Sequence, residues 1–241
     1  MINVANATCA QAPIEELTAL REPAALNRSR IVLSNGTLKL PMPHGIGRQS
    51  EFIASFQLPD PHSASASFSF GVALGGSGPN DDSDELLCLV EWSPIFNATF
   101  YEVPVSCGDR AVGPLSGGDR DTLRFAYHER ECEIRAYVDF TVAEVFFQKG
   151  RVVITKPLTT SNVSALSLVL NATAAGMSVS AADALSPDNV TVKKAESVET
   201  ARGVARLGNI TVLRATVFPM RSIWTTAESV TSSPYPLIFP P

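Results

Sequence analysis

Two carboxylates in the stretch "EIRAYVDFTVAEVFFQKGRVVIT", residues 133–155, have the type and spacing of a candidate acid pair: Asp139 and Glu144. Cleavage of a glycosidic bond needs two carboxyl groups that face one sugar ring at about 5–9.5 Å. The two residues flank the short turn "VDFTV", and a hairpin there predicts that Glu144 lies opposite Arg135 on the outer face as a cross-strand ion pair. Asp139, at the start of the turn, is expected to accept a hydrogen bond from its own backbone two residues on. We therefore predict structural roles for both carboxylates and no catalytic residue in this chain.

Two further acidic segments favour solvated surface over chemistry: "ERECE" at 129–133 is expected to be a solvated hairpin end, and "NDDSDE" at 80–85 a solvated acidic loop. The second, with Glu91 at position twelve counted from Asn80, follows the ligand spacing of a calcium-binding EF-hand loop, but it lacks the glycine at the sixth position and precedes a strand. The chain has no Gly-x-Ser-x-Gly motif and no glycine-rich phosphate-binding motif. We predict no metal site and no cofactor. The histidines stand in no catalytic motif: His44, His62 and His128.

Aromatic side chains could stack on sugars if they lie on an open face of the molecule, although core packing is the commoner role of any one aromatic ring. Sugars are therefore kept as candidate ligands. The rings concerned are Trp92, Tyr101, Tyr127 and Trp224.

The asparagines are distributed in a way that indicates the secretory pathway. Eight of the ten open an Asn-x-Ser/Thr sequon, whereas 41 Ser and Thr among 241 residues would place about two there by chance. We expect a glycosylated extracellular or secretory-pathway protein, with the cell wall and the vacuole as further locations. The first residues lack the basic and apolar regions of a signal peptide, so we expect the chain to be the downstream part of a longer protein. The candidate acceptors are Asn6, Asn27, Asn35, Asn97, Asn162, Asn171, Asn189 and Asn209.

Three cysteines are candidates for disulfide bonds in such an oxidising compartment: Cys88, Cys107 and Cys132. Cys88 and Cys107 would close the shortest inter-strand loop, but the sequence leaves the connectivity open. The fourth, Cys9, could pair with a residue upstream. None of them has a Cys-x-x-Cys spacing, which disfavours structural zinc.

The composition excludes two classes of partner. A net charge of −5, a pI of about 5.3 and scattered Lys and Arg provide no basic surface for nucleic acid. No apolar run reaches the roughly 18 residues of a membrane span, so we expect no membrane partner either. A homo-oligomer remains open.

Residues 13–21, "PIEELTALR", form the one segment with good helical spacing, and after it the pattern changes to strands. "RIVLSNGTLKL", 30–40, contains an Asn-Gly pair that predicts a hairpin. Short strands separated by Gly, Pro, Asp and Asn clusters follow as far as "NITVLRATVF", 209–218. Together they predict an all-β antiparallel sandwich of the jelly-roll or concanavalin-like type, preceded by a short connector helix. Alternation in 132–139 predicts which residues face the core: Ile134, Ala136 and Val138.

We expect three parts along the chain. Residues 1–24 would connect to an upstream domain, 25–224 would form the sandwich, and 225–241 are a Pro-rich, extended tail. Within the sandwich, residues 156–206 are rich in Ser, Thr, Ala and Asn and resemble a decorated insertion more than strands.

Residues 133–155 resemble the signature of the C-terminal β-sandwich of glycoside hydrolase family 32, which comprises the invertases, levanases and inulinases. In that family a strand ends in Val-Asp-x-Ser and is followed by a Val-Glu-Val-Phe run, an Asn/Gly turn and an Arg-containing strand. Two more segments agree in order: 13–21 is similar to the connector that leads out of the catalytic propeller, and "VFPMRSIW", 217–224, to the closing strand. The matching positions are Val138, Asp139, Thr141, Glu144, Val145, Phe146, Gly150, Arg151, Ser222, Ile223 and Trp224.

The resemblance also implies where the family's chemistry lies. Its catalytic carboxylates belong to an N-terminal propeller, on a Trp-Met-Asn-Asp-Pro-Asn stretch, an Arg-Asp-Pro triplet and a Glu-Cys pair. This chain has neither of the first two, and its Glu131-Cys132 lies in the strand region of the sandwich. Phe140 stands where the family usually has Arg, and Thr141 replaces Ser.

The resemblance therefore implies a non-catalytic sandwich of a secreted protein, whose role is to support an upstream β-propeller catalytic domain in the same protein or on a separate chain. Hydrolysis of sucrose or β-fructans would belong to the whole enzyme. A stand-alone lectin-like glycan-binding module is the alternative, and an adhesive or structural glycoprotein is a third.

Overall fold

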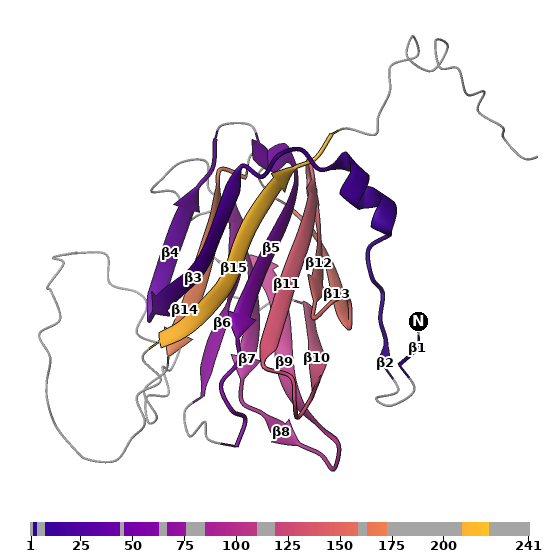
Figure 1. Cartoon of the computed structure of the whole chain (residues 1–241), viewed down its shortest axis with the longest axis vertical. Coiled ribbons are helices and arrows are strands. Elements are labelled where there is room, and N and C mark those ends of the chain that lie inside the picture. The colour runs from indigo at the N-terminus through magenta and orange to yellow at the C-terminus, as the bar shows by residue number, and fades with distance from the viewer. Residues whose placement is uncertain are drawn as a thin grey trace, which may run out of the picture.

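The computed structural model describes residues 2–3, 8–43, 46–62, 67–75, 85–109, 119–158, 163–172 and 209–221, which form two antiparallel sheets packed face to face (Figure 1). The first sheet has the strand order β10-β9-β7-β6-β14-β4, with β8 on β9, and the second has the order β13-β12-β11-β5-β15-β3. The prediction of an all-β antiparallel sandwich is confirmed.

The first sheet consists of β4 (Gly36–Pro41), β6 (Phe68–Gly75), β7 (Leu86–Trp92), β8 (Ile95–Phe96), β9 (Phe100–Asp109), β10 (Asp119–Ala126) and β14 (Ala165–Ala172). The second consists of β3 (Leu26–Ser34), β5 (Gln49–Gln57), β11 (Glu131–Asp139), β12 (Val142–Phe147), β13 (Val152–Pro157) and β15 (Asn209–Pro219). A ribbon of β1 (Ile2–Asn3) and β2 (Thr8–Cys9) precedes them, and two 3-10 helices lie at η1 (Glu15–Leu20) and η2 (Ile46–Arg48). No helix in these parts of the chain is long and apolar enough to cross a membrane.

The helix expected at residues 13–21 is the 3-10 helix η1, and it buries none of its residues. Ile14, at its N-cap, is 65% exposed, so the apolar spacing that indicated a helix does not serve core packing here. Short isolated helices are marginal in water. The position of η1 must therefore be fixed by contacts outside it.

The hairpin predicted at Asn35-Gly36 is wrong. β3 pairs with β15 in the second sheet, whereas β4 pairs with β14 in the first, so the chain turns a corner between the sheets. Gly36 has φ +127°, a conformation that other residues rarely adopt, and open space surrounds the position of its missing Cβ. The Asn-Gly pair thus signals a turn correctly, but it does not decide whether the flanking strands pair.

Part of the stretch expected to be an insertion, 156–206, is the interior strand β14, between β6 and β4. Residues 165–170 are all buried, so this strand lacks the apolar–polar alternation that identified the others. Its Ser167 hydroxyl donates a hydrogen bond to the buried carboxylate of Glu85 at 3.4 Å. Glu85 is therefore not part of a solvated acidic loop, and the preceding residues 81–84 lie outside the described residues.

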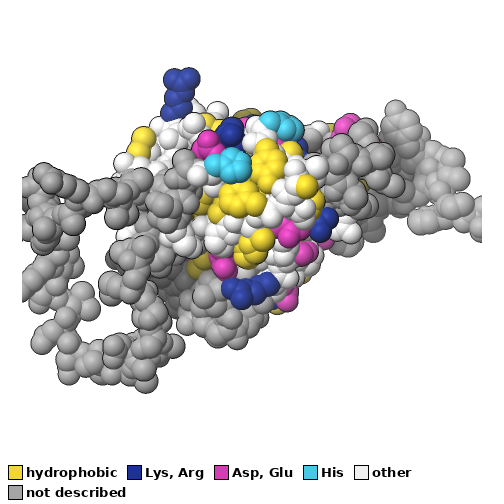
Figure 2. Space-filling view, turned by 90° about the horizontal axis from the view of Figure 1, so that it is seen from below, with side chains coloured by type: hydrophobic (Ala, Val, Ile, Leu, Met, Phe, Trp, Pro, Cys, Tyr) yellow, Lys and Arg dark blue, Asp and Glu magenta, His cyan; other side chains and the backbone are white. Residues whose placement is uncertain are grey.

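The core lies between the two sheets. The alternation predicted for 132–139 is confirmed, since Ile134, Ala136 and Val138 are buried in this core. Trp92 and Tyr101, two of the candidate sugar-stacking residues, are fully buried there, with ring centroids 5.7 Å apart. Hydrophobic side chains nevertheless remain on the surface at the end of the sandwich where β8 lies, seen from below in Figure 2.

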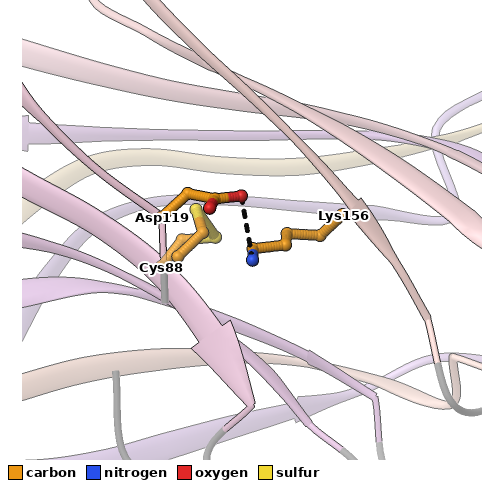
Figure 3. The surroundings of a disulfide bond; sticks show 4 residues. Cys88, Asp119 and Lys156 are labelled. Carbon is orange, nitrogen blue, oxygen red and sulfur yellow. Dashed lines mark ion pairs between the residues drawn. A yellow bond between two sulfur atoms is a disulfide. The ribbon is translucent and has the colours of Figure 1, made fainter. Parts of the chain in front are cut away.

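Cys88 on β7 and Cys107 on β9 stand directly opposite each other and form a disulfide bond in the core, with Cα atoms 4.2 Å apart. Beside it, Lys156 of β13 forms an ion pair with Asp119 of β10 (Nζ–Oδ2 2.9 Å), which joins the edges of the two sheets (Figure 3). Cys132, the third candidate, carries a free buried thiol. Burial raises the pKa of that thiol, so it stays protonated.

Loss of the Cys88–Cys107 disulfide should lower the free energy of unfolding by about 3 kcal/mol, because the bond restricts a loop with a sequence separation of 19 in the unfolded chain. Urea unfolding of the Cys88→Ser/Cys107→Ser double variant measures this loss. Cys132→Ala is the matched control, and a reductant should destabilise it as much as the parent protein. A reductant effect that disappears in Cys132→Ala would contradict the pairing.

Candidate functional site

The outer face of the second sheet carries a fully buried carboxylate, Glu51, on the interior strand β5. Its neighbours across the sheet are Tyr137 on β11 and Phe218 on β15. Arg21, which follows η1, lies over the same face, with its guanidinium carbon 4.8 Å from the centroid of the Phe218 ring. Glu51 has 0% exposure because side chains from the connector and the adjacent strands cover it.

Three side chains converge on the Glu51 carboxylate. Arg21 donates from Nε to Oε2 and from Nη2 to Oε1 (2.7 Å), a two-pronged ion pair. The Tyr137 hydroxyl donates to Oε1 at 2.9 Å. Arg135 adds a second positive charge, with Nη1 3.5 Å from Oε1. A buried ion is tolerated only with paired charge and hydrogen bonds, so these contacts make the burial of Glu51 possible.

The same contacts keep the Arg21 and Tyr137 donors protonated. The hydrogen bond to Glu51 raises the pKa of Arg21. Burial raises the pKa of Tyr137, and the negative charge of Glu51 adds to the rise. Both donors therefore keep their protons near neutral pH. A catalytic acid or base must exchange its proton near the working pH, so these two donors act as a clamp rather than in proton transfer.

The backbone beside Arg21 reinforces the clamp. The Glu22 amide donates to the Pro219 carbonyl, and the Arg221 amide donates to the Leu20 carbonyl, both at 2.9 Å. These bonds extend the sheet by a short antiparallel bridge at the end of β15. The chain that follows η1 is thus fixed by main-chain bonds as well as by charge.

Further back along the connector, the Gln11 amide donates to the Gly150 carbonyl at 2.8 Å. Gly150 has φ +85°, and a Cβ at this position would lie 2.3 Å from the Gln11 carbonyl oxygen. Only glycine meets both demands. This residue of the family signature therefore lets the connector approach the turn between β12 and β13.

The ion pair predicted between Glu144 and Arg135 is wrong. The turn between β11 and β12 has two residues and pairs Asp139 with Val142, which sets Glu144 opposite Tyr137. Arg135 instead lies opposite Phe146 and turns its charge to Glu51 and to Glu133. The register of a hairpin follows its turn length, which the residue types alone left open.

The remaining signature residues of the hairpin have packing and surface roles. Asp139 is exposed and accepts a hydrogen bond from the side chain of Gln49 at 3.0 Å. Phe146 is buried on the outer face with its ring edge-on to Tyr137, at a centroid distance of 5.9 Å. Three further signature positions lie outside the described residues: Ser222, Ile223 and Trp224.

Arg151, the signature residue after Gly150, ties the two sheets together. It donates from Nη1 and Nη2 to the two oxygens of Glu129 at 2.7 and 2.8 Å. Its Nη1 also donates to the Arg124 carbonyl at 2.8 Å, on β10 of the other sheet. Gln148 donates to Glu129 as well, at 3.0 Å.

The solvated acidic end predicted for 129–133 is therefore wrong for two of its three glutamates. Glu129 is held by Arg151, and Glu133 is buried between Arg135 (3.1 Å) and Arg214 (3.3 Å). Burial alone would raise the pKa of Glu129, but the hydrogen bonds from Arg151, from the Ala126 amide and from Gln148 outweigh it and lower that pKa. Among the described residues, no group of three or more His, Cys, Asp or Glu could hold a metal ion.

The glycosylation candidates that the structure describes are all exposed: Asn27, Asn35, Asn97, Asn171 and Asn209. Three others lie outside the described residues: Asn6, Asn162 and Asn189. Of the candidate sugar-stacking rings, Tyr127 is half-buried at the surface, and Trp224 lies outside the described residues.

The chain is thus an all-β sandwich with a clamped N-terminal connector. Comparison with family models found no match, and comparison with curated proteins found none either. Among solved structures, it is similar to fructan 1-exohydrolase IIa from Cichorium intybus (TM-score 0.61, 14% identity), with 90% of this chain covering 39% of that chain. It is also similar to exo-inulinase from Aspergillus awamori (TM-score 0.55, 16% identity), with 90% of this chain covering 33% of that chain.

At these identities the similarity establishes the fold, and the chain spans less than two-fifths of either enzyme. An inulinase is among the enzymes whose C-terminal sandwich the sequence resembles. The resemblance is therefore confirmed at the level of the fold. Glu51 and Arg21 were missed by reasoning from the sequence, because a single Glu in "EFIASFQL" reads as one outward polar residue among apolar ones.

Replacing Arg21 by Ala should lower the free energy of unfolding by about 3–5 kcal/mol, because it leaves the buried Glu51 carboxylate without its main partner. Urea unfolding measures the change. Arg28→Ala is the control, since Arg28 is exposed and bonds only to the neighbouring Asn27 carbonyl among the contacts observed. Equal stabilities of the two variants would contradict the clamp.

Glu129→Gln should destabilise the protein by about 2 kcal/mol at neutral pH. Because the pKa of Glu129 is lowered by folding, its contribution is present above the ordinary value of 4.5 and is lost as the pH falls below it. The difference in unfolding free energy between parent and variant should therefore shrink on acidification below that pH. Glu144→Gln, at an exposed carboxylate on β12, is the control. A difference that is the same at pH 7 and pH 3 would contradict the assignment.

Proposed function

We propose that this chain is the non-catalytic C-terminal sandwich of a secreted protein related to glycoside hydrolase family 32, and that it supports an upstream catalytic propeller. The observation that carries the proposal is the clamped connector. The segment that resembles the family's exit from the propeller, 13–21, is fixed to the sandwich by the Arg21–Glu51 pair, and the Gln11–Gly150 bond holds the chain just before it. Because the connector is held at two places, its direction is fixed, and a domain attached to it would be held in a defined position.

The surroundings of the carboxylates favour a structural role over a catalytic one. Two of the carboxylates nearest to the signature residues, Glu51 and Glu129, are saturated by arginine donors. Asp139 and Glu144, the candidate acid pair, are exposed. Electrostatic catalysis needs polar groups that are free to meet the reacting atoms in a site that excludes water, and neither pair meets both conditions. In the whole protein, hydrolysis of sucrose or β-fructans would belong to the propeller.

The sequons support the secretory pathway. Every candidate acceptor that the structure describes is exposed, as a modified side chain must be. An acceptor buried in the core would have argued against modification of that site. The lectin-like alternative is weaker, because Trp92 and Tyr101 lie in the core and have no face open to a sugar.

The purified chain, expressed in a host without invertase, should release no fructose from sucrose, inulin or levan. The same assay on the native protein, immunoprecipitated from its source with an antibody to this chain, should show release, because the propeller accompanies the sandwich there. Heat-treated immunoprecipitate is the control for chemical hydrolysis. Turnover by the purified chain would overturn the supporting role. An immunoprecipitate that contains no polypeptide beyond this chain would overturn the upstream propeller.

A further inference from the structure

The end of the sandwich at β8 exposes two large hydrophobic side chains. Ile95 is 64% and Phe96 48% exposed. Figure 2 shows the hydrophobic side chains that gather on this end, with histidines beside them. An exposed apolar patch on a soluble domain usually marks a surface that something covers.

The Phe96 ring belongs to an ordered group. It stacks with His62 (centroids 4.9 Å apart, planes 11° apart) and lies almost parallel to Tyr127 (6.4 Å, 6°). His62 and Tyr127 stack in turn at 5.4 Å. The fully buried Tyr101 contacts Phe96 from the core side at 6.5 Å. Neighbours on several sides hold the ring in place, and it remains 48% exposed at the surface.

A glycosylation sequon starts at the next residue: Asn97-Ala98-Thr99, in the loop between β8 and β9. The Asn97 amide donates to the Phe100 carbonyl at 2.9 Å, which closes the loop. The Tyr127 hydroxyl donates to the Asn97 carbonyl, which ties the loop to the ring group. The Asn97 side-chain oxygen accepts a hydrogen bond from the Ala98 amide at 2.7 Å. These bonds restrict the side-chain amide of Asn97, whose nitrogen is the atom that N-glycosylation modifies.

We propose that Asn97 carries an N-linked glycan whose innermost N-acetylglucosamine packs on the exposed face of Phe96. In the transfer, the Asn97 nitrogen forms a bond to the anomeric carbon of a lipid-diphosphate-linked oligosaccharide, the bond from that carbon to the diphosphate oxygen breaks, and the amide proton goes to a base. The lipid diphosphate leaves. The inference rests on the proposed passage through the secretory pathway, which supplies this donor.

The sugar ring and the Phe96 ring have complementary surfaces. One side of a pyranose ring presents C–H groups, whose hydrogens are slightly positive, and the face of an aromatic ring is negative. Packing of the two removes apolar surface from water without leaving a sugar hydroxyl buried. The apolar patch is then covered by a sugar attached to the same chain, and no second protein is required to cover it.

The first test is occupancy. The full chain is expressed in a secretory host, the glycans are released by an amidase in ¹⁸O-water, and the converted Asn residues are identified by mass spectrometry. Asn97 should be occupied. Occupancy of Asn35 and Asn209 without Asn97 would overturn this inference and leave secretion standing, whereas no occupancy at any sequon would overturn the secretory proposal itself.

The second test is packing, measured by thermal unfolding. Thr99→Ala removes the sequon and should lower Tm by about 2–4 °C relative to the glycosylated parent. Phe96→Ala should abolish that difference, and Phe96→Tyr, which keeps a flat ring, should retain it. Thr37→Ala, which removes the sequon at Asn35 with no aromatic neighbour in sequence, is the matched control, and its effect should not depend on residue 96.

Two results would contradict the packing. One is a Thr99→Ala effect that is equal in the parent protein and in the Phe96→Ala background. The other is saturable binding of free glycans to Thr99→Ala protein that is lost with Phe96→Ala, which would make the patch a lectin site for foreign sugars. The test can be judged even if Phe96→Ala weakens the fold, because Phe96→Leu keeps the apolar volume and removes only the flat ring.

Discussion

One buried carboxylate decides how the connector lies on the sandwich. Glu51 lies on an interior strand with no access to water, and an unpaired carboxylate there would cost several kcal/mol. The two-pronged contact from Arg21 meets this need, and Tyr137 and Arg135 complete it. Arg21 comes from outside the sandwich strands, so the folded sheet requires the connector to lie across it.

The contacts that hold the connector also explain how the outer face of the second sheet is covered. The helix η1 has no buried residue of its own, so charge and main-chain bonds at the end of β15 hold it where an apolar helix would use a hydrophobic stripe. Gly150 removes the side chain that would block the connector at its other end. The long side chains of Arg135 and Tyr137 lie over the sheet with their polar ends on Glu51, so an outer face that reads as polar is largely closed to solvent.

The sequence predicted the local features well and the non-local ones poorly. Alternation gave the inner face of β11, and turn residues separated most of the strands, because both signals lie within a few residues. β14 was not predicted, because an interior strand that is buried on both faces has no alternation of apolar and polar residues. The partner of Asn35-Gly36 and the register of Glu144 were wrong, since each depends on which strand comes alongside. Glu51 was missed for the same reason: its partner Arg21 is 30 residues away in the chain.

The signature that identified the fold is itself part of this architecture. Gly150 admits the connector, Arg151 joins the sheets through the Arg124 carbonyl, and Phe146 packs against the tyrosine that bonds Glu51. A pattern whose members fix chain direction and sheet contact can specify a domain without containing any reacting group. The carboxylates that resembled an acid pair are exposed ends of that pattern, so their spacing reflects a two-residue turn rather than the width of a sugar ring. In the proposed function, the reacting carboxylates belong to the domain that precedes the connector.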